Sequence, residues 1–387
     1  MSCKEWKVVS LDEIATMKYG KMPKKDKILN EGFPIFSGYR IVGYYDEYMF
    51  ENSEVIVVAR GVGGTGDVKL SPPKSYITNL SIALQLNEKL VNKKFIYYKL
   101  GNENLRQLDS GSAQSQITIN DLKRYTIKLP SLEEQEKIAN ILSSLDDKIE
   151  LNNEMNKTLE EMAQSIFKRW FVDFEFPNED GKPYKSSGGE MVDSELGMIP
   201  KGWEVGALDD IANTTMGASP KSSSYNTENI GMPLLNGASD FNGTIINPTK
   251  HTTEPKKICK KDDMVFCIRA TIGNLTFADK EYCIGRGVAS VTPKDERYRE
   301  FIYFNINDSI QSLISQATGS VFLNLTKDNI NKMKIVIPTK EVLNKFSEIT
   351  SNIINKVQSN NVENEGLINL RDSLLPKLMS GELKVLK

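Results

Sequence analysis

The residues of this chain best suited to chemistry are cations, hydroxyls and amides in glycine-containing loops. One such loop, at residues 18–25, carries Lys18, Tyr19, Lys21, Lys24 and Lys25. The corresponding loop about 200 residues later carries Ser219, Lys221 and Ser222. Lysines and hydroxyls among glycines suit contacts with the phosphates of nucleic acid, and a solvated charged loop is the open alternative.

Arginines and amides form a second group with the same repetition. Arg60 and Arg269 each follow an apolar run that predicts a strand, while Gln114, Gln116 and Asn324 precede the last short helix expected in each half. Arginine can donate two hydrogen bonds to guanine, and an amide can pair in the same way with adenine. The alternatives are an arginine that caps a core carbonyl and an amide that is merely exposed.

Catalytic and metal-binding patterns are not found. The only histidine is His251, so no Ser-His-Asp, Cys-His or His-Glu cluster can form. The four cysteines lack metal-ligand spacing, which argues against a zinc site. Residues 61–66 (GVGGTG) match a nucleotide-binding pattern, but the prolines that follow prevent the helix such a site needs, so we expect a turn between strands.

The chain repeats itself with a period of about 200 residues, far longer than that of a solenoid. Residues 6–15 (WKVVSLDEIA) return as residues 203–212 (WEVGALDDIA), and residues 95–98 (FIYY) return as residues 301–304 (FIYF). The repetition predicts two similar domains and an approximate twofold axis within one polypeptide, which suits a ligand with two similar parts such as duplex DNA with two half-sites.

A long helical pattern with a heptad seam follows each domain. Two asparagines lie in each seam, and in a seam this residue is best known for fixing register. If the helices are antiparallel, Asn152 should face Asn364 and Asn156 should face Asn360, with four amides satisfied together. Packing of each helix on its own domain is the alternative.

Charge is unevenly distributed along the 387 residues, whose net charge is −2. Residues 1–130 carry 19 basic and 14 acidic residues, residues 131–200 carry 7 and 16, and residues 201–338 carry 16 and 15. Phosphate binding needs only local positive charge. The absence of an export signal or a long apolar run, together with few cysteines, suggests a cytoplasmic protein.

These patterns predict an α+β fold with two mixed α/β domains separated by two long antiparallel helices that form a coiled-coil spacer with pseudo-twofold symmetry. In the first domain we expect short helices at residues 11–17 and 95–100, and in the second domain at residues 208–214 and 301–306. The expected divisions are residues 1–130 (first domain), 131–175 (first long helix), 176–200 (connector loop), 201–338 (second domain) and 339–387 (second long helix and tail).

The sequence resembles the specificity subunit of Type I restriction–modification systems. The resemblance is carried by the repeated residues 6–15 and 203–212, by residues 129–139 (LPSLEEQEKIA) and by residues 374–383 (LLPKLMSGEL), and it covers nearly the whole chain. It implies two target-recognition domains that each read half of a split sequence in double-stranded DNA. It also implies docking of DNA adenine methyltransferase subunits and of a restriction (translocase) subunit; S-adenosylmethionine, ATP and Mg²⁺ would belong to these partners.

The sequence therefore favours a DNA-recognition subunit without catalytic activity, cofactor or metal of its own. Two alternatives stay open. A degenerate methyltransferase would bind S-adenosylmethionine, whereas an assembly scaffold would protect no defined DNA sequence, and the weak basicity of residues 201–338 favours the scaffold.

Overall fold

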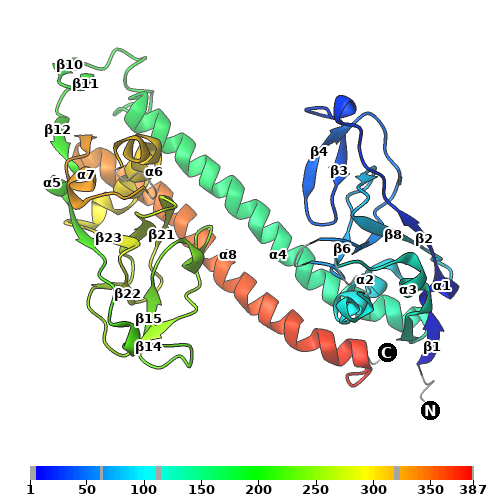
Figure 1. Cartoon of the computed structure of the whole chain (residues 1–387). Coiled ribbons are helices and arrows are strands. Elements are labelled where there is room, and N and C mark those ends of the chain that lie inside the picture. Colours follow the sequence, from blue (N-terminus) through cyan, green and yellow to red (C-terminus); the bar gives the residue numbers. More distant parts are fainter. Residues whose placement is uncertain (1–5, 62–63, 110–114, 318–322, 386–387) are drawn as a thin grey trace. The chain divides into compact units, whose positions relative to one another are not determined.

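The computed structural model describes residues 6–61, 64–109, 115–317 and 323–385 (Figure 1). Its contacts divide the chain into unit 1 (residues 1–151 and 363–387) and unit 2 (residues 152–362). Two long helices, α4 (Leu132–Phe167) and α8 (Lys340–Ser380), each contribute residues to both units.

Unit 1 is built around a four-stranded antiparallel sheet in the order β2-β8-β5-β6. Its central strands are apolar and buried, because α2 and the long helices cover one face while a smaller sheet, β4-β3-β7, packs on the other. A third sheet pairs β1 with β9. The strands are β1 (Lys7–Ser10), β2 (Ala15–Tyr19), β3 (Phe33–Phe36), β4 (Ile41–Tyr45), β5 (Val55–Val58), β6 (Val68–Leu70), β7 (Tyr76–Ile77), β8 (Ser81–Leu86) and β9 (Thr126–Leu129). The short helices are α1 (Leu11–Ile14), η1 (Lys25–Lys27), α2 (Lys93–Gly101), η2 (Leu105–Leu108) and α3 (Ile119–Arg124).

Unit 2 repeats this plan. Its four-stranded sheet has the order β13-β23-β20-β21, a second sheet has the order β14-β18-β15-β22-β19, and β12 pairs with β24 as β1 pairs with β9. The strands are β10 (Met191–Ser194), β11 (Gly197–Pro200), β12 (Glu204–Ala207), β13 (Ala212–Met216), β14 (Tyr225–Asn226), β15 (Met232–Leu235), β16 (Phe241–Asn242), β17 (Ile245–Ile246), β18 (His251–Thr252), β19 (Ile258–Cys259), β20 (Met264–Cys267), β21 (Gly273–Phe277), β22 (Tyr282–Ile284), β23 (Val288–Pro293) and β24 (Lys334–Ile337). The short helices are η3 (Lys168–Val172), α5 (Leu208–Ile211), η4 (Ser222–Ser224), η5 (Ala238–Asp240), η6 (Glu296–Tyr298), α6 (Arg299–Gln316) and α7 (Lys327–Asn331).

Several expected element bounds were wrong. The helices expected at residues 11–17 and 208–214 last a single turn, because Ala15 and Ala212 are already extended and begin strands that pair with β8 and β23. One helical turn is marginal, so a ladder of five residue pairs prevails. The helix expected at residues 301–306 is the much longer α6, and the expected connector loop contains the antiparallel hairpin β10–β11.

Within each unit the long helices run antiparallel. In unit 1, Arg371 of α8 pairs with Asp146 of α4 at 2.8 Å and Lys148 pairs with Glu363 at 3.2 Å. In unit 2, Asn156 pairs with Asn360, and the rings of Phe167 and Phe346 lie 6.3 Å apart. In both units, contacts at higher residue numbers of α4 are made with lower residue numbers of α8, as antiparallel helices require.

The heptad seam and the alternative packing are both present, in different stretches. Near the middle of the helices, the seam residues Asn156, Val357 and Asn360 are buried within unit 2, whereas Ile138, Leu142 and Leu378 join the core of unit 1. Phe167 and Phe346 likewise join the core of unit 2. The long helices are therefore part of each domain's core at their ends.

Candidate nucleic-acid interface

In unit 1 the chain brings Arg60 opposite Gln116 in an antiparallel bridge. Arg60 leaves the buried strand β5 through Ala59, whose carbonyl accepts a hydrogen bond of 2.9 Å from the Ile117 amide. Ala59 and Ile117 are fully buried, while Arg60 is exposed and Gln116 is half-buried. Residues opposite each other in such a bridge project their side chains to the same face, so an arginine and an amide stand side by side at the surface.

Unit 2 repeats this relationship with Arg269 and Asn324, which form the equivalent antiparallel bridge. Leu325 is fully buried, and its amide donates to the carbonyl of Ile268 at 2.9 Å. The neighbouring Ala270 amide donates to the carbonyl of Leu323 at 3.0 Å. Four of the residues selected from the sequence thus meet in two equivalent pairs.

The amide member of each pair sits just before a capped helix. Thr118 and Thr326 cap α3 and α7, and the side-chain oxygens of Asp121 and Asn329 accept hydrogen bonds from the backbone N–H groups of these capping residues. This reciprocal capping fixes the entry of the chain into each helix. In unit 1, the Asp109 carboxylate also accepts a hydrogen bond of 2.7 Å from the backbone N–H of Gln116.

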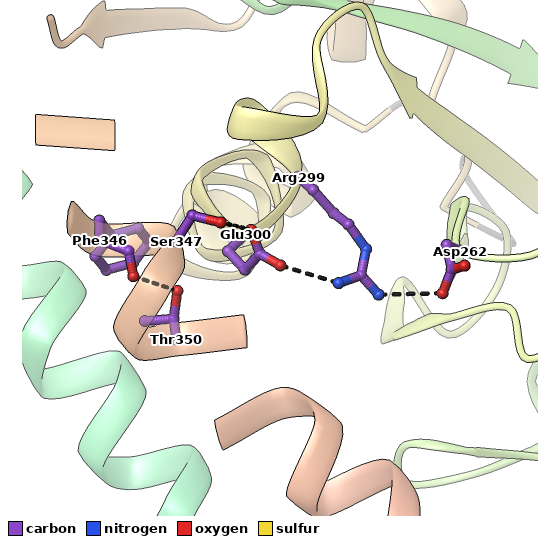
Figure 2. Close-up of polar contacts among 6 residues, drawn as sticks. All are labelled: Asp262, Arg299, Glu300, Phe346, Ser347 and Thr350. Carbon is purple, nitrogen blue, oxygen red and sulfur yellow. Dashed lines mark hydrogen bonds and ion pairs between the residues drawn. The ribbon is translucent and has the colours of Figure 1, made fainter. Parts of the chain in front are cut away.

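A cation at the start of a helix anchors the other end of each arginine-bearing strand. Arg299 of α6 binds Glu300 at 2.9 Å and Asp262, two residues before β20, at 3.3 Å (Figure 2). Glu300 is almost fully buried and also accepts a hydrogen bond of 2.9 Å from Ser347 of α8. The strand that ends near Arg269 is therefore fixed to both α6 and α8 at its beginning.

Lys93 of α2 has the equivalent role in unit 1. Its Nζ donates to the Ser53 carbonyl at 2.8 Å and lies 3.8 Å from the Glu54 carboxylate, just before β5. Burial raises the pKa of the Glu54 carboxyl, while the charge of Lys93 opposes that shift.

The basic loop of unit 1 is exposed at every lysine that the sequence selected. Lys18 and Tyr19 end the edge strand β2, Lys21 and Lys24 follow it, and Lys25 begins the helical turn η1. Tyr19 is partly committed to the fold, because its hydroxyl accepts a hydrogen bond of 3.1 Å from the Ile119 amide at the start of α3.

Glycine is required at one point of each loop. A Cβ added to Gly20 would lie 2.1 Å from the carbonyl oxygen of Thr78, and one added to Gly217 would lie 2.1 Å from that of Gly285. Only glycine lets these backbones approach so closely. The same contact therefore holds both loops against the segment that precedes β8 or β23.

The loop of unit 2 contains Ser219 (half-buried), Lys221 and Ser222 (both exposed), of which Ser219 lines a pocket of about 300 Å³. Arg269, Asn236 and Arg286 line the same pocket. Arg286 was not selected from the sequence. Its position between Gly285 and Gly287, directly before a strand, was the only available signal.

The remaining selected residues fall in different places. Gln114 lies outside the described residues. Of residues 61–66, which lie between β5 and β6, the described residues 61 and 64–66 form no helix, and residues 64–66 form a turn. The ring of Tyr39 packs over Gly64, where a Cβ would lie 1.6 Å from the tyrosine hydroxyl. This matches the expected turn between strands. Within the described ranges, no group of three or more potential metal ligands occurs and no helix is long and apolar enough to cross a membrane.

The four seam asparagines are all buried. In unit 2, Asn360 donates to Asn156, which in turn donates to Asn361 at 2.8 Å. Asn361 donates to Thr244 of the β16–β17 hairpin at 3.3 Å. The Asn360 oxygen has no hydrogen-bond partner among the described residues, so the expectation of fully satisfied amides was wrong for this residue.

Comparison with known proteins agrees with this duplicated architecture. Residues 3–161 and 200–368 each match the Type I restriction modification DNA specificity domain. The putative type I restriction enzyme MjaX specificity subunit of Methanocaldococcus jannaschii is 31% identical over 275 residues, which are 70% of this chain and 62% of that protein. The type I restriction enzyme HindI specificity subunit of Haemophilus influenzae is 27% identical over 370 residues, covering 78% of this chain and 80% of the relative.

A solved structure shows the same fold. The S subunit of a Type I restriction–modification system from M. genitalium aligns with a TM-score of 0.67 and 21% identity, covering 96% of each chain. The curated relatives are named specificity subunits, so the family confirms the expectation of a non-catalytic recognition chain. With both halves matched by the same specificity domain, the chain belongs to the family of Type I restriction–modification specificity subunits.

Proposed function

We propose that this chain binds double-stranded DNA and recognises a bipartite target, with one half read by each domain. Residues 1–130 and 201–338 are the two recognition domains, residues 131–175 and 339–387 are the spacer helices and tail, and residues 176–200 are the connector. The observation that carries the proposal is the repeated bridge of Arg60 with Gln116 and of Arg269 with Asn324.

Each bridge combines two side chains that can identify a base pair. Arginine donates in a fork to guanine, and glutamine or asparagine pairs with adenine through one donor and one acceptor. Because buried neighbours fix the backbone beneath both side chains, binding needs to order only the side chains themselves. The exposed lysines of the unit 1 loop would supply sequence-independent contacts with phosphates.

The long helices separate the two readers, and the exposed faces of those helices dock DNA adenine methyltransferase subunits. A restriction (translocase) subunit completes the assembly. S-adenosylmethionine, ATP and Mg²⁺ act in those partners, since this chain supplies recognition.

Sequencing of methylated adenines in the host genome, with and without this gene, tests the function. The expected result is a split motif that disappears when the gene is deleted and returns with the wild-type gene. Unchanged methylation after deletion would contradict the proposal. Binding of S-adenosylmethionine by the isolated chain would instead favour the degenerate methyltransferase.

A further inference from the structure

The pocket of unit 2 has the features of an anion site. It is about 300 Å³ in volume and is lined by two arginines, Arg269 and Arg286, by Ser219 and by Asn236, with glycine and alanine forming the rest of its wall. Residues 201–338 carry little net positive charge, and two of their cations lie together at this pocket. Anion binding depends on such local charge.

Arg286 is held so that its terminal nitrogens stay available. Its Nε donates to the Ser219 hydroxyl at 3.2 Å, and its backbone amide approaches the same oxygen at 3.4 Å. No described carboxylate forms an ion pair with Arg286. The nearby carboxylate of Asp240 is buried and accepts hydrogen bonds from the amides of Asn236 and Gly237 at 2.6 and 3.1 Å.

The backbone packs closely in the wall of this pocket. A Cβ added to Gly287 would lie 2.3 Å from the Asn236 carbonyl oxygen, so glycine is needed there. Ala270 has a φ of 61°, in the left-handed region that is unfavourable for alanine. Strained residues of this kind concentrate at binding sites, where the surrounding structure sustains them.

We propose that this pocket binds one phosphate group of the DNA backbone, with the Arg286 guanidinium as its main donor and Ser219 as the residue that positions it. The inference rests on the proposed DNA-binding function. A phosphate projects from the duplex and suits a hollow, whereas base edges lie within the grooves and are reached by projecting side chains. The Arg286 fork matches two phosphate oxygens.

Unit 1 lacks this pocket chemistry at the equivalent positions. The Gly20 amide donates to the Ser81 carbonyl as the Gly217 amide donates to that of Val288, which aligns Met22 with Ser219 and Asn79 with Arg286. Unit 1 instead exposes Lys21, Lys24 and Lys25 in its loop. The two domains would therefore grip the backbone by different means: a lysine loop in one and an arginine pocket in the other.

The test uses the assembled complex purified through a tagged copy of this chain. Binding to DNA with and without the genomic methylation motif is measured between 50 and 200 mM salt for wild type and Arg286→Ala. We expect the variant to bind both DNAs about ten-fold more weakly at the lowest salt. The slope of log affinity against log salt should fall by about 0.9, the value for one phosphate contact, and the methylation motif should be unchanged.

Two control variants separate this effect from a general loss of charge. Asn79→Ala changes the equivalent position of unit 1, and Lys201→Ala removes an exposed cation paired with Glu190 in unit 2. Both should bind as wild type does. Because Arg286 is exposed, its variant should unfold at the wild-type temperature, which checks that the domain is intact.

The outcomes are distinct. If the wild-type complex binds DNA and the salt dependence of Arg286→Ala equals that of wild type, the pocket assignment alone is overturned. The same holds if the variant loses affinity only for DNA with the motif and changes the methylation motif, because that result would mean that Arg286 reads a base. A wild-type complex that binds no DNA overturns the proposed function as well.

Discussion

Asn360 donates a hydrogen bond of 2.8 Å from its Nδ2 to the Oδ1 of Asn156, between the long helices within unit 2. Asn360 is fully buried and Asn156 nearly so. A buried amide pair costs stability relative to apolar packing, and its best-attested benefit is a unique register.

Replacement of one partner should therefore destabilise the protein. We expect Asn360→Leu to lower the free energy of unfolding by about 1–3 kcal/mol, because the Asn156 oxygen stays buried without its donor. Urea denaturation of the full chain measures the change. Asn355→Leu, at an exposed position of the same helix, is the matched control and should change stability by less than about 0.5 kcal/mol.

The double variant Asn156→Leu with Asn360→Leu distinguishes pairing from mere size. Removal of both amides should restore part or all of the lost stability, although Asn361 then loses the donor that Asn156 provides. Additive losses in the two single variants would contradict an energetic coupling between them.

The arginine–amide bridges should control separate halves of the DNA target. Arg60→Ala or Gln116→Ala should relax one half of the methylation motif, and Arg269→Ala or Asn324→Ala the other, with about 1–3 kcal/mol of discrimination lost at the affected base pair. Sequencing of methylated genomic DNA shows which half has changed. Relaxation of both halves by one substitution would contradict independent reading.

Helix length should set the gap between the two halves of the motif. Inserting one heptad into both α4 and α8 lengthens each by about 10 Å, equivalent to about three base pairs if the whole increment lies along the DNA. We expect a gap longer by about one to three base pairs in the methylation motif. The insertion belongs after Asn156 in α4 and before Asn360 in α8, in register with the seam.

A heptad inserted into only one helix is the control. It should impair assembly, since the antiparallel seam can no longer align at both ends. An unchanged gap after the double insertion, in a complex that still methylates, would show that the helices are no ruler.

The repetition and the heptad seams predicted most of the fold because both are long-range patterns with a simple physical period. The pairing of Asn156 with Asn360 was predicted for antiparallel helices, and within each unit the helices are antiparallel. Short elements were less predictable. Residues 11–17 have a helical start at Ser10 with Glu13, but strand pairing with β8 decides their conformation after one turn.

The candidate interface was predictable residue by residue but not as an arrangement. Arg60 and Gln116 are far apart in sequence, and only the fold shows that they are opposite each other. Arg286 was not predicted, because the equivalent position of the first repeat is Asn79 rather than a lysine or arginine. The hollow around it depends on glycine contacts that composition does not reveal.

The buried thiols of unit 2 should be unreactive in the folded protein. Burial raises the pKa of the Cys259 thiol to about 12 and that of Cys267 to about 12, so near neutral pH neither forms an appreciable fraction of the reactive thiolate. Because the folded state disfavours ionisation of these thiols, they should lower the free energy of unfolding only as the pH rises above the ordinary thiol pKa.

Alkylation with iodoacetamide, read by mass spectrometry in a Cys3→Ser background, measures this. At pH 8 we expect Cys259 and Cys267 to react at least ten-fold more slowly in the native protein than in guanidinium, where their pKa returns to its ordinary range. Reaction of native Cys267 at the unfolded rate would mean that the strand before Arg269 opens readily. Since that strand supports the arginine–asparagine pair, such opening would also contradict a rigid, preformed reader in unit 2.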